Sequence, residues 1–235
     1  MIGFTLQWHI TQRCENHCKH CYMDNDRYDL PFKDFLLCLD NIQESENNDF
    51  LISSVVLTGG DPLLNPDWYA ISRELVKRGK KLSILGNPET LSAINIAKLS
   101  NLNLRMFQLS LDGLRETHDR LRYDGSFKKT IDAIHLLSKY RIPIGIMFTI
   151  SGENENELLH VIDYLDSLNV NIGFSFDFLI EIGHARENSI VNSVNKGKCF
   201  TNYIQKKEEL KKKGSKLILF DKPSQLFAFV NSHYG

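Results

Sequence analysis

The sequence has no marked excess of one charge. Its 28 lysine and arginine residues nearly balance 29 aspartate and glutamate residues, and the formal net charge is −1. Proteins that bind nucleic acid usually carry a clearly basic balance, so this composition argues against a nucleic-acid partner. No stretch approaches the roughly 18 apolar residues of a membrane span, and the first residues show no secretion signal. We therefore expect a cytoplasmic protein that does not bind a membrane.

Cysteine is scarce and unevenly placed. The chain has five cysteines in 235 residues, and three of them lie within one stretch of eight. A disulfide-stabilised secreted domain would distribute an even number along a short chain, whereas clustered thiols in a cytosolic protein more often bind metal. Hydrophobic residues make up 42% of the chain, which is ordinary for a soluble protein with one substantial core.

The clustered cysteines, Cys14, Cys18 and Cys21, have the spacing C-x3-C-x2-C and follow a predicted strand that ends near Thr11. Three thiolates on one short loop can hold three corners of a cubic iron–sulfur cluster and leave one iron open to a small molecule. Structural zinc needs four ligands, commonly from two separate pairs. A zinc-binding interaction module without catalysis, completed by His17 or His20, is the alternative from a different class.

Strand patterns and helix patterns alternate along the chain. This alternation predicts an α/β fold, a partial (β/α)6 TIM-like barrel of parallel strands. We expect the barrel over residues 1–190 and a short C-terminal helical extension over 191–235. Ligands bind such folds at the carboxyl ends of the strands, so the loops that follow the strands should share one face. The predicted strands span residues 4–11, 51–58, 82–85, 105–111, 142–150 and 170–180.

A glycine-rich turn, Gly59-Gly60-Asp61-Pro62, ends the second predicted strand. Two glycines let the backbone approach a ligand closely, and proline fixes the exit of the turn. Alone, this motif is typical of a plain strand-to-helix turn. Its expected position beside the cysteine loop, on the same barrel face, favours a ligand-binding role.

Together these residues resemble the radical S-adenosylmethionine (radical SAM) superfamily. The three cysteines match its C-x3-C-x2-C motif, His20 fills its aromatic slot, and Gly59 to Pro62 match its "GGE" turn with Asp61 in place of glutamate. The resemblance implies a [4Fe-4S] cluster on the cysteines, S-adenosylmethionine on the open iron, and contact between the turn backbone and its amino group. Reduction, by a donor such as flavodoxin or ferredoxin, would then yield a 5′-deoxyadenosyl radical that abstracts hydrogen from a substrate.

A third stretch points to one branch of that superfamily. Ser110-Leu111-Asp112-Gly113, followed by His118-Asp119, Arg122 and Gly125-Ser126-Phe127, looks like the "SLDG…HD…R…GSF" run of the branch with SPASM-type C-terminal domains. The resemblance implies that Ser110 and Asp112 lie near the ribose or carboxylate of S-adenosylmethionine, and that Arg122 pairs with the carboxylate. Because this branch includes peptide maturases, it implies a peptide substrate. Radical chemistry on a small molecule, such as a cofactor or haem precursor, is the alternative.

The sequence also departs from this branch. SPASM-type members continue into a cysteine-rich segment that binds auxiliary clusters, and this sequence stops before one, at Gly235. We expect either a longer native chain or an enzyme with a single cluster. The helix pattern predicts that Cys38 is a core thiol and Cys199 an inert helix cysteine. Asn87 is predicted to cap a helix, and His184 to be a polar loop residue. No residue selects the substrate or the reaction outcome.

Overall fold

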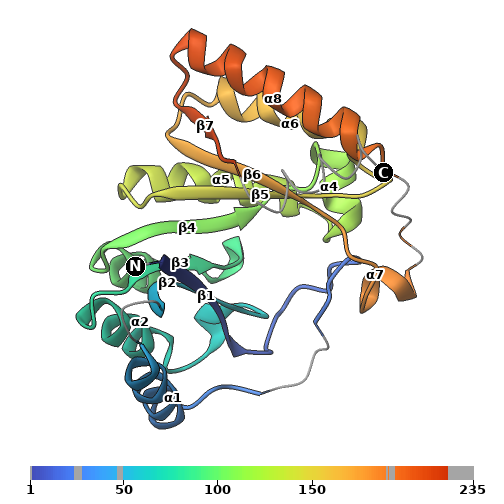
Figure 1. Ribbon diagram of the computed structural model, residues 1–235. Helices are drawn as coiled ribbons and strands as arrows, with labels where there is room; N and C mark the ends of the chain where they lie inside the picture. Colours follow the sequence, from blue (N-terminus) through green and yellow to red (C-terminus); the bar gives the residue numbers. More distant parts are fainter. Residues whose placement is uncertain (1, 24–27, 47–49, 189, 191–193, 222–235) are drawn as a thin grey trace. The chain divides into compact units, whose positions relative to one another are not determined.

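The computed structural model describes residues 2–23, 28–46, 50–188, 190 and 194–221. Within these ranges the chain divides into two compact units. Unit 1 draws on residues 1–15, 23–108 and 139–143, and unit 2 on residues 16–22, 109–138 and 144–235. Seven parallel strands, in the order β1 to β7, make up the sheet of the described chain (Figure 1). None of the described helices is both long and apolar enough to cross a lipid bilayer.

Unit 1 contains the first strands of the sheet and the helices between them. Its central strand, residues 50–59, is buried on both faces, as the continuous apolar run predicts. Val55 and Leu57 on one face and Thr58 on the other are almost inaccessible. Leu57 pairs with Trp8 on one neighbouring strand and with Ile84 on the other. The elements are β1 (Ile2–Thr11), α1 (Phe32–Ser45), β2 (Phe50–Gly59), α2 (Trp68–Lys77), β3 (Lys81–Leu85), α3 (Ala93–Ser100) and β4 (Leu104–Ser110), whose last two residues belong to unit 2.

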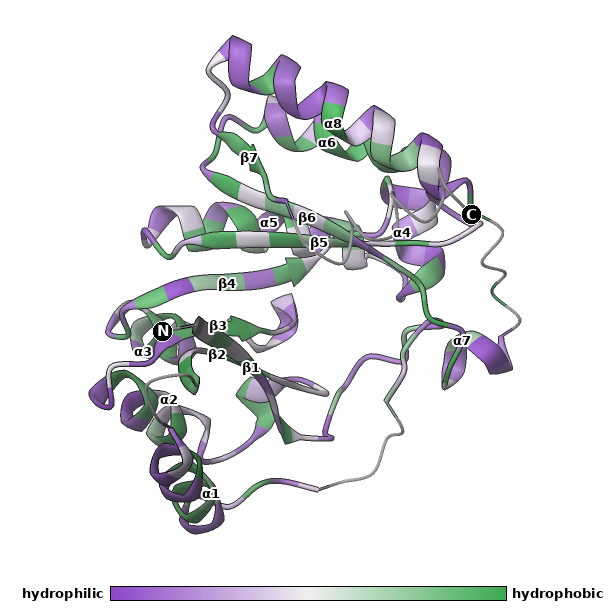
Figure 2. Ribbon diagram, in the orientation of Figure 1, coloured by the Kyte–Doolittle hydropathy of each residue, from purple (hydrophilic) through white to green (hydrophobic). Residues whose placement is uncertain are grey.

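Unit 2 contains the remaining strands and a long helix packed at the end of the sheet. This helix, α8, is largely hydrophilic (Figure 2), but it buries Tyr203 against Phe176, with ring centroids 4.8 Å apart. The Tyr203 hydroxyl also donates to the carbonyl of Phe174 at 3.2 Å, which fixes the helix to the sheet. The elements are α4 (Arg115–Leu121), α5 (Ser126–Lys139), β5 (Ile144–Ile150), α6 (Leu158–Ser167), β6 (Ile172–Phe178), α7 (His184–Glu187), α8 (Lys196–Lys213) and β7 (Leu217–Leu219).

The predicted α/β fold with parallel strands is confirmed, and the structure adds elements that the pattern did not predict. Helices α4 and α7 are absent from the prediction, whereas the seventh strand, β7, lies within residues 216–220, where the sequence pattern allows one more short strand. Asn87 occupies the N-cap position of a short 3₁₀ helix, Pro88–Thr90, but its side chain makes no capping hydrogen bond. The α-helix itself begins later, at α3, where Ser92 accepts from the amide of Asn95. The division at residue 190 stays a prediction.

Candidate functional site

The cysteine loop leaves β1 at Thr11, a buried residue fixed by side-chain hydrogen bonds within unit 1. The Thr11 hydroxyl donates to Asp29 Oδ1 at 2.6 Å and accepts from the amide of Arg13 at 3.0 Å. The Arg13 guanidinium pairs with the other oxygen of Asp29 at 3.1 Å. These bonds set the direction in which the chain enters the loop, immediately before Cys14.

The glycine turn after β2 packs its backbone directly against this entry. The amide of Gly60 donates to the carbonyl of Thr11 at 2.9 Å, and the amide of Asp61 donates to the carbonyl of Arg13 at 2.7 Å. A Cβ atom at Gly59 would lie 2.1 Å from the Thr11 carbonyl oxygen, and one at Gly60 would lie 2.2 Å from that of Arg13. The glycines are therefore needed because two backbones approach too closely for any side chain.

Gly59→Ala should destabilise the protein by about 3 kcal/mol, because Gly59 has φ +145° and a methyl group there would overlap the Thr11 carbonyl. The matched control is Gly79→Ala, since Gly79 also has a positive φ, +74°, but a methyl group added there would meet no atom within 4 Å. The control should cost only about 1 kcal/mol. Urea unfolding of both variants separates the effects, and equal costs would contradict the close-approach explanation.

Asp61 holds a neighbouring loop rather than facing solvent. Its buried carboxylate accepts from the amide of Leu63 at 3.0 Å, from the Thr90 hydroxyl at 2.9 Å and from the amide of Asn87 at 3.3 Å. The side-chain amide of Asn87 in turn donates to the Cys14 sulfur at 3.5 Å. Asn87, which the sequence pattern assigned to a helix cap, thus contacts a predicted cluster ligand. The signal that could have found it is its position at the end of β3.

The stability of the protein should depend on pH through Asp61. Burial raises the pKa of its carboxyl group from 3.8 to about 6, although the hydrogen bonds that the carboxylate accepts act to lower that pKa. A raised folded-state pKa means that protonated Asp61 stabilises the fold below about pH 4, and that this contribution disappears as the pH rises through about 6. The unfolding free energy of the wild type should fall by about 3 kcal/mol relative to Asp61→Asn across that interval. A constant difference between the two proteins in denaturant titrations at several pH values would contradict this expectation.

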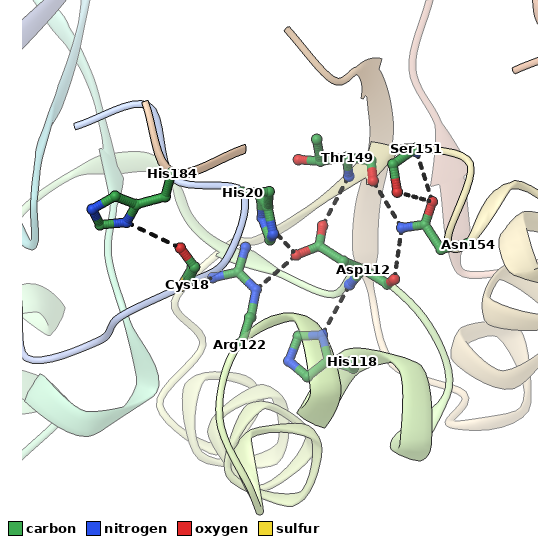
Figure 3. Close-up of polar contacts among 9 residues, drawn as sticks. All are labelled: Cys18, His20, Asp112, His118, Arg122, Thr149, Ser151, Asn154 and His184. Carbon is green, nitrogen blue, oxygen red and sulfur yellow. Dashed lines mark hydrogen bonds and ion pairs between the residues drawn. The ribbon is translucent and has the colours of Figure 1, made fainter. Parts of the chain in front are cut away.

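Unit 2 contains a polar network centred on Asp112, which follows β4 and is completely buried (Figure 3). Its Oδ2 accepts from Arg122 Nε at 2.7 Å and lies 3.4 Å from His20 Nε2. Its Oδ1 accepts from the amide of Thr149 at 2.8 Å. Asp112 therefore joins the cysteine loop, helix α4 and strand β5.

The backbone of Asp112 is fixed as firmly as its carboxylate. Its amide donates to His118 Nδ1 at 2.9 Å, so His118 carries its proton on Nε2. Burial lowers the pKa of His118 to about 4, which keeps the ring neutral. The carbonyl of Asp112 accepts from Asn154 Nδ2 at 2.8 Å. The sequence pattern gave no role to His118 or Asn154, and only the "HD" letters of the family run drew attention to His118.

Charge pairing dominates this network. Burial alone would raise the pKa of Asp112, but Arg122 and His20 outweigh it and hold that pKa well below its usual range. Burial would lower the pKa of Arg122, but Asp112 and the Cys18 sulfur more than compensate, so the pKa of Arg122 is raised. The two side chains form an ion pair that is 12% exposed at Arg122 and 0% exposed at Asp112.

The unit 2 part of the cysteine loop is attached to α4 and α7. The amide of Lys19 donates to the carbonyl of Leu121 at 2.9 Å, and the amide of His184 donates to the carbonyl of Cys21 at 2.8 Å. Arg122 Nη1 donates to the Cys18 sulfur at 3.6 Å. Burial raises the pKa of the Cys18 thiol, and the Arg122 charge opposes that shift. Helices α4 and α7, which the sequence pattern did not predict, are thus the elements that position Cys18 and Cys21.

The donor set of the loop fits an iron–sulfur cluster, although the three sulfurs fall in different units. Cys14 belongs to unit 1, Cys18 and Cys21 belong to unit 2, and none of these three described cysteines forms a disulfide. In the part of the chain that the structure describes, no three His, Cys, Asp or Glu side chains are grouped in metal-binding geometry. Two of the sulfurs nevertheless already accept N–H hydrogen bonds, from Asn87 and Arg122. Such bonds to ligand sulfurs are the usual means by which proteins tune these clusters.

The remaining predicted residues have varied environments. Ser110 is partly buried at the end of β4. Cys38 is exposed on α1, so its prediction as a core thiol is wrong, because the apolar face of that helix buries Phe35 and Leu39 instead. Cys199 is buried on α8, and burial raises the pKa of its thiol to about 11, which suits an inert residue.

Comparison with known proteins supports the same interpretation of the motif. A family model described as the radical SAM superfamily matches residues 8–165, more than half of the chain. Pre-heme d1 synthase of Dinoroseobacter shibae is 25% identical over 186 residues, which cover 77% of this chain and 45% of that protein. The sporulation killing factor maturation protein SkfB of Bacillus subtilis is 25% identical over 190 residues, which cover 79% of this chain and 44% of that protein.

The solved structures show the fold. Streptococcus suis SuiB bound to S-adenosylmethionine has a TM-score of 0.80 at 15% identity, and the match covers 97% of this chain and 52% of SuiB. SuiB bound to the precursor peptide SuiA gives a TM-score of 0.78 at 13% identity, over 97% of this chain and 51% of SuiB. The chain thus spans about half the length of the relatives that it matches.

Proposed function

This chain belongs to the radical SAM superfamily of enzymes, and from that premise we propose that it cleaves S-adenosylmethionine reductively at a [4Fe-4S] cluster and abstracts hydrogen from a peptide substrate. The observation that carries the proposal is the C-x3-C-x2-C loop, whose three cysteines follow β1 inside the matched region and form no disulfide with one another. The buried carboxylates of Asp61 and Asp112 support the residues that donate to two of those sulfurs.

Each group of predicted residues has a separate role in this reaction. Cys14, Cys18 and Cys21 would hold the cluster, which when bound supplies the electron for cleavage of S-adenosylmethionine. The turn from Gly59 to Pro62 keeps the entry to the cysteine loop in place. Ser110 and the residues around Asp112 would contact S-adenosylmethionine. The electron donor is a flavodoxin or ferredoxin, and the reaction takes place in the cytoplasm.

Two similar proteins support the peptide substrate. SkfB is named as a maturation protein for the sporulation killing factor, and SuiB is seen with its precursor peptide SuiA. A second candidate is chemistry on a small molecule. It is favoured by the similarity to pre-heme d1 synthase, which covers 77% of the chain, against 79% for the similarity to SkfB.

Deuterium transfer separates the two candidates. The anaerobically reconstituted protein is supplied with reductant, S-adenosylmethionine and either a perdeuterated peptide digest or a perdeuterated porphyrin. Hydrogen abstraction from the substrate should raise the mass of the released 5′-deoxyadenosine by about one unit per event. We expect the label only in the peptide arm. Label in the porphyrin arm alone would assign the small-molecule reaction instead.

A further inference from the structure

Arg122 is placed between a predicted cluster ligand and a buried carboxylate (Figure 3). Its Nε donates to Asp112 Oδ2 at 2.7 Å, and its Nη1 donates to the Cys18 sulfur at 3.6 Å. All three residues belong to unit 2, so this geometry is internal to one compact unit. Among the described residues, two side chains pair with the Asp112 carboxylate, the guanidinium of Arg122 and the ring of His20.

The orientation of Arg122 is fixed by groups other than the sulfur. Asp112 cannot rotate toward another partner, because Oδ1 accepts from the amide of Thr149 and its own amide donates to His118. The planar guanidinium fork then directs one N–H toward Asp112 and another toward Cys18. The backbone of the loop is fixed beside it, since the amide of Lys19 donates to the carbonyl of Leu121, the residue before Arg122.

We propose that Arg122 sets the reduction potential of the iron–sulfur cluster through its charged hydrogen bond to the Cys18 sulfur, with Asp112 as the positioning residue. The inference rests on the proposed function, because it takes Cys18 to be a cluster ligand. It also gives Arg122 a role that is separate from the predicted contact with the carboxylate of S-adenosylmethionine, since this role acts through the Cys18 sulfur.

The direction of the effect follows from charge. Reduction adds one electron, supplied by the external donor, and makes the cluster and its thiolates more negative. A cationic N–H donor on a ligand sulfur stabilises this reduced form more than the oxidised form. Because the Arg122 side chain is only 12% exposed, solvent screens this charged donor little. Loss of the Arg122 bond should therefore make the cluster harder to reduce.

The test is a reductive titration of the reconstituted protein in the absence of S-adenosylmethionine, monitored by the electron paramagnetic resonance signal of the reduced cluster. Arg122→Gln should lower the equilibrium constant for reduction on the order of tenfold, which corresponds to ~59 mV for a one-electron couple. The matched control is Arg120→Gln. It removes the same charge two residues earlier, on helix α4, at a residue whose side chain is 50% exposed and pairs with Glu153.

Arg122→Lys keeps the measurement informative if Arg122→Gln does not fold, because lysine retains the charge beside Asp112. A single ammonium lacks the planar fork that reaches both partners, so we expect the lysine to pair with Asp112 and to leave the Cys18 sulfur without its donor. The reduction potential of Arg122→Lys should therefore shift in the same direction as that of Arg122→Gln. Equal potentials for Arg122→Lys, Arg120→Gln and the wild type would overturn the inference while leaving the proposed function intact. A wild-type protein that takes up no cluster would overturn the proposed function itself.

Discussion

Replacing Cys18 with alanine should abolish cluster binding. Reconstituted wild-type protein should carry about four irons per chain, and the variant should carry less than about one, because two thiolates cannot retain a cubic cluster. Release of 5′-deoxyadenosine should disappear with it. Iron and sulfide analysis, together with the brown colour of the protein, measures the first effect, and chromatography of the reaction mixture measures the second.

Cys38→Ala is the matched control for this experiment. Cys38 is exposed on α1, so the same chemical change removes a free thiol that lies outside the cysteine loop. This variant should keep its iron and its activity. If Cys18→Ala retained as much iron as Cys38→Ala, Cys18 would not be a ligand and the assignment of the whole triplet would fail.

Asp112→Ala should lower the free energy of unfolding by about 3–5 kcal/mol, because it leaves the buried guanidinium of Arg122 without a counter-charge. The amide of Thr149 also loses its acceptor. Urea unfolding of the cluster-free protein under reducing conditions measures the effect without any contribution from iron.

The control for Asp112 is Asp132→Ala on helix α5. Asp132 is 60% exposed and pairs with Lys128, at position i−4 on the same helix. Exposed pairs of this kind contribute little, so the change should stay within about 0.5 kcal/mol. If both alanine variants unfolded at the same urea concentration as the wild type, the buried network would not stabilise unit 2.

The elements that could be predicted are those whose hydrophobic pattern is long and regular. The apolar run 51–58 became β2, and the helical hydrophobic repeat over residues 126–139 became α5. A buried parallel strand and an amphipathic helix each require many residues of one pattern, so local sequence carries the information. The cysteine motif could be recognised for a related reason, since its spacing is contained in one loop.

Helices α4 and α7 could not be predicted because they are short and polar. Neither carries an apolar repeat long enough to indicate a helix. Each is held by a backbone hydrogen bond to the cysteine loop, α4 at Lys19 and α7 at Cys21. The partners of Asp112 lie at distant positions in the sequence, at His20 and Thr149. Spacing placed Asp112 at a strand end, but only the folded chain shows which groups its carboxylate binds.

The role of Asn87 shows the same limit in a single residue. Its position before Pro88 favours a helix cap by local propensity, and that preference is real for isolated helices. In the folded unit, however, Asp61 accepts from the amide of Asn87, and the side-chain amide is directed to the Cys14 sulfur. Tertiary contacts outweighed a local preference worth only about 1 kcal/mol.

The most direct test of the central claim is the release of 5′-deoxyadenosine by the anaerobically reconstituted wild-type protein. With a strong reductant and S-adenosylmethionine, we expect release that depends on both reagents and that Cys18→Ala and Cys21→Ala abolish. Protein that carries about four irons per chain and still releases no 5′-deoxyadenosine under these conditions would contradict the claim that this chain is a radical enzyme.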